Sequence, residues 1–188
     1  MNFRSIDLKA AYVLVAIGLM ALIPAQGAYT NITLWHYNAS LDFGEKHITI
    51  GPMAVSSDTN SISRSIRITG DNASDWASVT QYEGRNPTAP GMEEMLWILM
   101  KPSCKRVWIN EDYVGDRYGL VATGDARVEH GFGQVCYGGM VPLTTGGEGT
   151  NQYFAIIAHF LNETLNEQVV RTARLSYAAE PESIAAAA

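Results

Sequence analysis

The stretch Tyr-Phe-Ala-Ile-Ile-Ala-His-Phe-Leu, residues 153–161, decides the fold. Apart from His159 it is apolar at both odd and even positions, which predicts a strand that is buried on both faces. A strand of this kind lies inside a sheet that has other elements packed above and below it. We therefore expect residues 153–161 to form a central strand.

A helix is predicted directly after this strand. Thr164 and Glu167 have the spacing of a capping box, in which the two side chains close the first turn of a helix. One helical face is then marked by Leu165, Val169, Ala173 and Tyr177, with Val170 beside it. The alanine-rich residues 178–188 are expected to form a disordered tail.

Working back toward the N-terminus, residues 105–143 predict an antiparallel meander. Strands are expected at residues 107–109, 118–123 and 135–141, with glycines between them. The glycine-rich residues 144–150 are expected to turn the chain into the central strand.

The first half of the domain predicts further strands and one helix. Strands are expected at residues 47–50, 53–55 and 61–69, with Gly51-Pro52 as a break or bulge in between. Residues 76–82 fit a strand or a helix, and residues 84–91 fit a loop. Residues 92–100 fit a helix whose methionine-rich face joins the core.

The whole is an α+β fold: one domain over residues 28–177, with an antiparallel sheet of about five to seven strands and two main helices packed on it.

Residues 1–27 have the order of a secretory signal peptide. Arg4 and Lys9 precede an apolar run at residues 10–23, and Ala25-Gln26-Gly27 offers a cleavage site after Gly27. The run is shorter than the roughly 20 residues of a membrane-spanning helix. We expect a secreted or extracytoplasmic protein. The alternatives are a protein held on the outer face of the membrane by uncleaved residues 10–23, and a buried N-terminal helix.

Cysteines and glycosylation sequons fit the same compartment. Cys104 and Cys136 are the two cysteines, and in an oxidising compartment they are expected to form one disulfide; two separate buried thiols are the alternative. Sequons for N-glycosylation begin at Asn31, Asn38, Asn72 and Asn162.

The end of the domain also resembles a known family. A strand buried on both faces, a brief loop and a helix that ends at Leu175-Ser176-Tyr177 resemble the close of PsbP-like domains, the extrinsic photosystem II family. The resemblance covers residues 153–177 of 188, and Met53 follows Pro52 where that family has an aromatic residue. It implies a small exported α/β/α sandwich around an antiparallel sheet, without catalysis.

Charge and motifs exclude several function classes. The net charge is −6 and no basic cluster exceeds Lys105-Arg106, which argues against nucleic acid as a partner. Residues 144–150 lack the Lys-Ser/Thr of a phosphate-binding loop. Residues 110–116 fit a solvated turn better than a calcium loop, because Val114 stands at a ligand position. No cofactor or metal is expected.

Catalytic signatures are missing from the sequence. The four histidines, at positions 36, 47, 130 and 159, are scattered, and no Gly-x-Ser-x-Gly elbow nominates a nucleophile. Aromatic residues in expected turns, such as Tyr82 and Tyr113, are candidate contact anchors.

The sequence favours an exported binding or accessory domain without catalytic machinery, whose partner is an unknown protein or small molecule. A secreted hydrolase whose acids converge only in the fold, and a structural cell-surface component, are the alternatives. Contact with a membrane is expected only through an uncleaved N-terminal segment.

Overall fold

The structure is a computed structural model that describes residues 29–84, 89–126, 135–143 and 151–177. The predicted signal peptide, the turn at residues 144–150, residues 85–88 of the predicted loop, His130 and the alanine-rich tail lie outside these residues.

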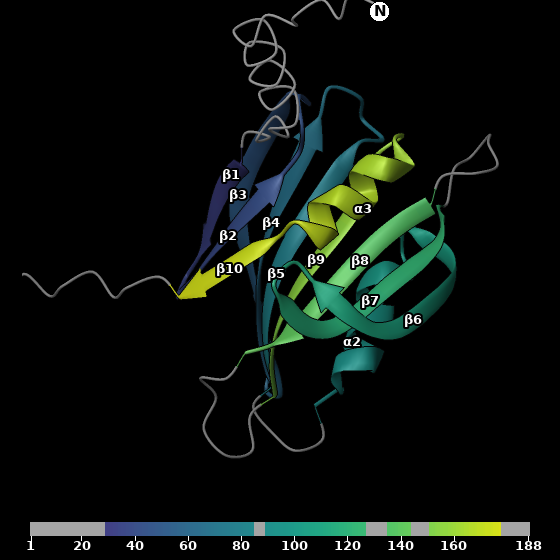
Figure 1. Ribbon diagram of the computed structural model, residues 1–188. Helices are drawn as coiled ribbons and strands as arrows, with labels where there is room; N and C mark the ends of the chain where they lie inside the picture. The colour runs from purple at the N-terminus through teal and green to yellow at the C-terminus, as the bar shows by residue number, and fades with distance from the viewer. Residues whose placement is uncertain (1–28, 85–88, 127–134, 144–150, 178–188) are drawn as a thin grey trace, which may run out of the picture.

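Ten strands form two antiparallel sheets, and two helices pack on them (Figure 1). The large sheet has seven strands in the order β3 (Ile48–Ser57), β4 (Ser61–Gly70), β5 (Trp76–Gly84), β9 (Asn151–His159), β8 (Val135–Pro142), β7 (Arg117–Ala126) and β6 (Cys104–Val114). The small sheet has the order β1 (Tyr29–Leu34), β2 (Tyr37–Asp42) and β10 (Arg174–Tyr177). The helices are α2 (Met92–Met100) and α3 (Glu163–Arg171).

The predicted α+β class and the central strand are confirmed. β9 is the fourth of the seven strands, and its residues from Tyr153 onward are buried. Phe154 and Ile156 point into a core that the small sheet and α3 cover, whereas Ala155 and Ile157 point into a second core under α2. The expected five to seven strands correspond to the large sheet alone, because the small sheet was not predicted.

Two adjacent glycines of β8 let both helices approach the sheet. Neighbouring residues of a strand point to opposite faces. A Cβ atom on Gly138 would lie 2.6 Å from Met100 Sδ of α2, and a Cβ atom on Gly139 would lie 2.7 Å from Val170 Cγ1 of α3. Each helix therefore occupies space that any larger residue of β8 would fill.

The predicted helix after β9 is shorter than expected and has a different cap. α3 ends at Arg171, and residues 174–177 form β10 on the free edge of β2, so Tyr177 is not on a helical face. The N-cap is Asn162, whose Oδ1 accepts a hydrogen bond from the Leu165 N–H at 3.3 Å. The capping box at Thr164 was wrong.

Residues 29–42, for which no element was predicted, form β1 and β2. Residues 76–82, which fit a strand or a helix, form a strand. Residues 110–114 continue β6, so the turn expected at residues 110–116 is limited to Gly115 and Asp116. The expected bulge at Gly51-Pro52 is present as a register shift between Ile50 and Met53.

Cys104 and Cys136 form the predicted disulfide, with their Cα atoms 6.3 Å apart. It links β6 to β8, two strands that are separated by β7 in the sheet. Gly124 of β7 faces Cys136 across the ladder and lies beneath the bridge. A Cβ atom on Gly124 would lie 3.1 Å from the Cys104 Cβ atom, so glycine leaves room for the crossing.

Two buried polar side chains fix the chain where β9 ends. Asp75 accepts hydrogen bonds from Lys46 Nζ at 2.6 Å and from the Leu161 N–H at 2.8 Å. Asn166 accepts from the Phe160 N–H at 2.6 Å and donates to the carbonyl oxygens of Phe160 and Val135. Both residues are fully buried, and their hydrogen bonds offset the cost of removing them from water.

Candidate functional site

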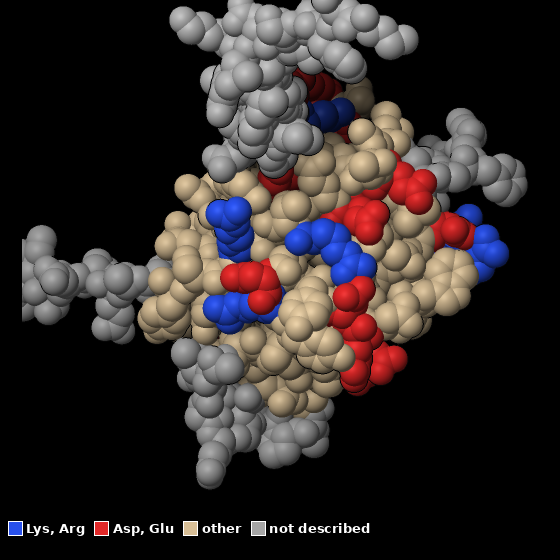
Figure 2. All heavy atoms as spheres, in the orientation of Figure 1, with Lys and Arg blue, Asp and Glu red and all other residues tan. Residues whose placement is uncertain are grey.

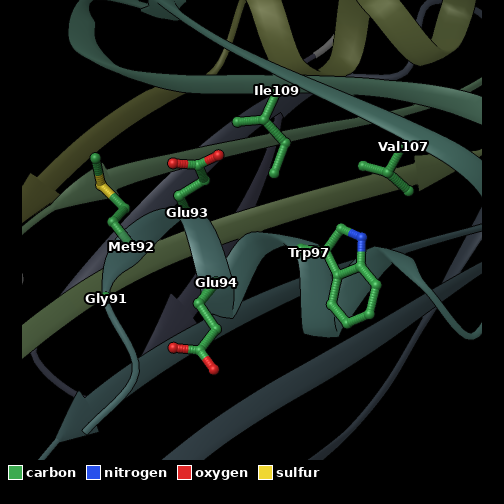
Figure 3. Close-up of a pocket in the computed structure, with 7 residues that line it drawn as sticks. All are labelled: Gly91, Met92, Glu93, Glu94, Trp97, Val107 and Ile109. Carbon is green, nitrogen blue, oxygen red and sulfur yellow. The ribbon is translucent and has the colours of Figure 1, made fainter. Parts of the chain in front are cut away.

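A groove lies between α2 and the curled strand β6 (Figure 3). Its volume is about 550 Å³, within the range of small-molecule sites. It is lined by Gly91, Met92, Glu93, Glu94, Trp97, Val107 and Ile109.

The groove follows from the two-sided pattern of α2. Met95, Leu96 and Met100 are buried against the sheet, which confirms that the methionine-rich face belongs to the core. Trp97 lies on the other side of the helix and is 42% exposed. β6 has a register shift between Lys105 and Trp108. Val107 lies within this bulge and Ile109 follows it, and both side chains line the groove.

Two carboxylates at the start of α2 give the groove its charge. Among the described residues that line it, Glu93 and Glu94 are the charged ones. Their side chains point to opposite sides of the helix, with Glu93 directed toward Ile109 and Glu94 directed away (Figure 3). A pair of acids for hydrolysis must face a common bond, and this pair does not. The groove therefore has an apolar lining with negative charge at one end.

The four sequons lie at accessible positions. Asn31, Asn72 and Asn162 are exposed, and Asn38 is half-buried. Asn31 and Asn38 lie on neighbouring strands of the small sheet, and each side chain accepts a hydrogen bond from a hydroxyl on the other strand. The Ser40 hydroxyl donates to Asn31 Oδ1, and the Thr33 hydroxyl donates to Asn38 Oδ1 at 2.7 Å.

The described histidines are not brought together. His159 is buried, with Nδ1 3.0 Å from the Ser74 carbonyl oxygen and its ring stacked on Trp76, as expected of a core histidine. His47 is exposed near Asp71, and His36 lies in the turn between β1 and β2.

The two aromatic residues expected in turns both lie in strands. Tyr82 is buried in β5 and stacks on Tyr153, so its assignment to a turn was wrong. Tyr113 is exposed on β6 and makes an edge contact with Tyr118.

A charged cluster around Arg171 ties the end of α3 to the β6–β7 hairpin. Arg171 Nη2 lies 2.7 Å from Asp112 Oδ2, and Nη1 donates to the Tyr113 carbonyl oxygen at 2.9 Å. The hydrogen bond from Arg171 holds the pKa of Asp112 below its usual value. Burial raises the pKa of the Tyr137 phenol, which lies beside the same guanidinium. On this face of the molecule acidic groups separate the basic ones (Figure 2).

Among the described residues, no three histidine, cysteine or acidic side chains are grouped to bind a metal ion. Likewise, no helix in the described ranges is both long and apolar enough to cross a membrane. No protein-family model matches the chain, and comparisons with curated proteins and with solved structures found no significant match. The resemblance of residues 153–177 to PsbP-like domains therefore stays a prediction.

Proposed function

We propose that this chain is an exported binding domain whose groove between α2 and β6 holds a small molecule with an apolar body and a positively charged group. The observation that carries the proposal is the composition of the groove. Four apolar side chains line it, and the charged groups among its described lining residues are the carboxylates of Glu93 and Glu94. Apolar walls with a few placed polar groups are typical of ligand sites.

Each part of such a ligand has a partner in the groove. The Trp97 side chain lies below Val107 in the view of Figure 3, and the two form one apolar wall. An aromatic body against this wall would lose its contact with water. A positive group beside Glu93 would meet the opposite charge.

Binding is tested by calorimetric titration with three probes of one shape. Naphthylmethylammonium, naphthylmethanol and naphthylacetate share the ring system and are positive, neutral and negative. We expect affinity to fall in that order. Equal binding of the anion would contradict the proposal, as would absence of binding by all three.

Matched variants assign the binding to the groove. Trp97→Ala is expected to weaken binding of the cation about 30-fold, as loss of a central aromatic anchor does. Trp108→Ala is the control, since Trp108 is comparably exposed on β6 but does not line the groove. Glu93→Gln is expected to weaken binding about two- to fivefold. Glu163→Gln, in the first turn of α3, should leave it unchanged.

Export is the second part of the proposal. The signal-like order of residues 1–27 supports it, and a disulfide is compatible with an oxidising compartment. N-terminal sequencing of protein recovered outside the cells is expected to begin near Ala28. An intact Met1 on cell-bound protein would instead indicate a protein tethered by residues 10–23.

A further inference from the structure

A second cavity lies where the small sheet meets the ends of β5 and β9. Its volume is about 230 Å³. The small sheet contributes the turn between β1 and β2 and the last residue of β10, which meet at one end of that sheet (Figure 1). The lining residues are Trp35, His36, Tyr37, Gln81, Glu83, Gln152 and Tyr177.

Aromatic rings form one continuous side of this cavity. Tyr37 and Tyr177 meet edge to face, with ring centroids 5.3 Å apart and planes at 82°. His36 lies parallel to Tyr177 at 5.9 Å, and Trp35 lies 3.9 Å from His36. Aromatic faces carry partial negative charge and attract cations. The guanidinium of Arg64 already lies over one of these ring faces: its Cζ atom is 3.5 Å from the centre of the Trp35 ring.

The backbone of Trp35 is strained in order to present this ring. Its φ angle is +46°, in the left-handed region that residues with a side chain rarely adopt. In a two-residue hairpin turn this first position usually holds glycine. Glycine or asparagine would make a more stable turn, so tryptophan at this position lowers the stability of the fold. Strain of this kind gathers at binding sites.

A buried acceptor also belongs to the lining of the cavity. Gln81 is 2% exposed, and its Oε1 atom receives no hydrogen bond from the part of the chain that the structure describes. An unsatisfied buried acceptor is costly, and in native structures it usually awaits a water or a ligand. A ligand N–H group in the cavity would supply the missing bond. Glu83 follows two residues later on the same face of β5 and is the one carboxylate among the described residues that line the cavity. Arg64, which pairs with Gln81 across the ladder, lies beside the lining at Trp35.

We propose that this cavity is a second binding site, independent of the groove at α2, and that it takes a compact organic cation bearing N–H donors, such as an alkylammonium group. The aromatic side holds the positive charge, Gln81 accepts the N–H, and Glu83 balances the charge. A neutral polyol would satisfy Gln81 but would offer no positive charge to Glu83. A quaternary ammonium would satisfy Glu83 and the rings but offer no donor to Gln81.

Three probes separate these requirements. Cyclohexylammonium carries charge and N–H donors, its N-trimethyl derivative carries charge alone, and cyclohexanol carries a donor alone. In titrations followed by NMR, we expect saturable binding of cyclohexylammonium with a dissociation constant of about a millimolar, and binding at least about tenfold weaker for the other two. Equal binding of either of the others would overturn the proposal, as would absence of binding by cyclohexylammonium.

Variants place the probe in this cavity. Gln81→Met keeps the size of the side chain and removes the acceptor. It is expected to weaken binding of cyclohexylammonium about tenfold without lowering the thermal midpoint of the free protein. Gln168→Met, on α3 and outside the cavity, is the matched control. Trp35→Gly suits the turn and removes the ring, so it should weaken binding while the hairpin remains.

The Trp97→Ala variant separates this site from the groove at α2. It should leave cyclohexylammonium binding unchanged. Loss of binding in Trp97→Ala but not in Gln81→Met would assign the cation to the groove and reject the second site.

Discussion

Asp75 carries its charge in a fully buried position, and its neighbours make this possible. Burial alone raises the pKa of this carboxyl, but hydrogen bonds from Lys46, the Leu161 N–H and Asn72 outweigh it, so the pKa lies below its usual value. A buried charge that loses its partner is far more costly than an exposed one. The Lys46–Asp75 pair is therefore expected to contribute to stability in a way that surface pairs do not.

Replacing Lys46 tests this expectation. Lys46→Met is expected to lower the free energy of unfolding by about 3 kcal/mol, because it leaves the carboxylate buried without its cation. Urea denaturation measures the change. Arg106→Met is the control: its pair with Asp125 is exposed, and its loss should cost less than about 1 kcal/mol. Equal losses in the two variants would show that burial of Asp75 does not decide the energetics.

The same pair predicts a dependence on pH. Because the pKa of Asp75 is lower in the folded protein, its contribution is complete above the unfolded value of about 3.9 and is lost as pH falls through the folded value. The difference in stability between wild type and Lys46→Met should therefore shrink below about pH 4. Denaturation curves at several pH values check this, and a constant difference would contradict it.

Gly115 is needed for space as well as for backbone conformation. Its φ angle is +60°, and a Cβ atom there would lie 1.6 Å from the Ala173 carbonyl oxygen. Gly44 has nearly the same φ angle, +59°, but its nearest neighbour would be 3.7 Å away. Gly44→Ala should cost about 1 kcal/mol for the backbone alone. Gly115→Ala should cost about 3 kcal/mol or more, because the β6–β7 hairpin must move away from α3. Similar costs in thermal denaturation would count against this steric reason.

At the scale of elements, the cap of α3 can be tested directly. Asn162→Ala is expected to lower stability by about 1 kcal/mol, because the Leu165 N–H loses its acceptor. Thr164→Ala should change stability by less than about 0.5 kcal/mol, since Thr164 is exposed and is not the cap. The comparison uses protein made without glycans, so that loss of the Asn162 sequon has no separate effect. The opposite ranking would restore the capping box.

The disulfide links the start of β6 to β8. Reduction is expected to lower stability by about 2–4 kcal/mol while the fold is kept, because one core contains neither cysteine and the other is built mostly from other apolar side chains. Chemical denaturation with and without reductant measures the loss, and far-ultraviolet circular dichroism checks the fold. Two free thiols in non-reducing peptide maps of protein recovered outside the cells would reject the bridge.

Elements with a strong local pattern could be predicted from the sequence, and elements that depend on distant partners could not. The apolar run of β9 and the methionine-rich face of α2 have clear patterns, and both were predicted correctly. β10 was mistaken for helix because Ala173 and Tyr177 continue the spacing of α3. The free edge of β2 decides that segment instead, which is a contact between residues far apart in the chain. Tyr82 looked like a turn residue until its stacking partner, Tyr153, was known.

At the scale of the whole molecule, both cavities arise where elements distant in the chain come together. Trp97 and Val107 belong to different elements, and only the curl of β6 over α2 makes them one wall. Trp35, Tyr37 and Tyr177 could be named as aromatic residues from the sequence, but nothing local places Gln81 beneath them. Gly138 and Gly139 could be predicted as strand residues. The sequence could not show which helix packs against each of them.

The position of β2 between β1 and β10 has a consequence for how the molecule is made. The small sheet joins strands near residue 40 to a strand that begins at Arg174, so it cannot be completed until nearly the whole domain has been synthesised. Until then the apolar face of the large sheet that the small sheet and α3 cover remains open. Pairing across so long a stretch of chain is slow. A polypeptide whose fold closes late stays extended for longer, which would favour the export that we propose for this chain.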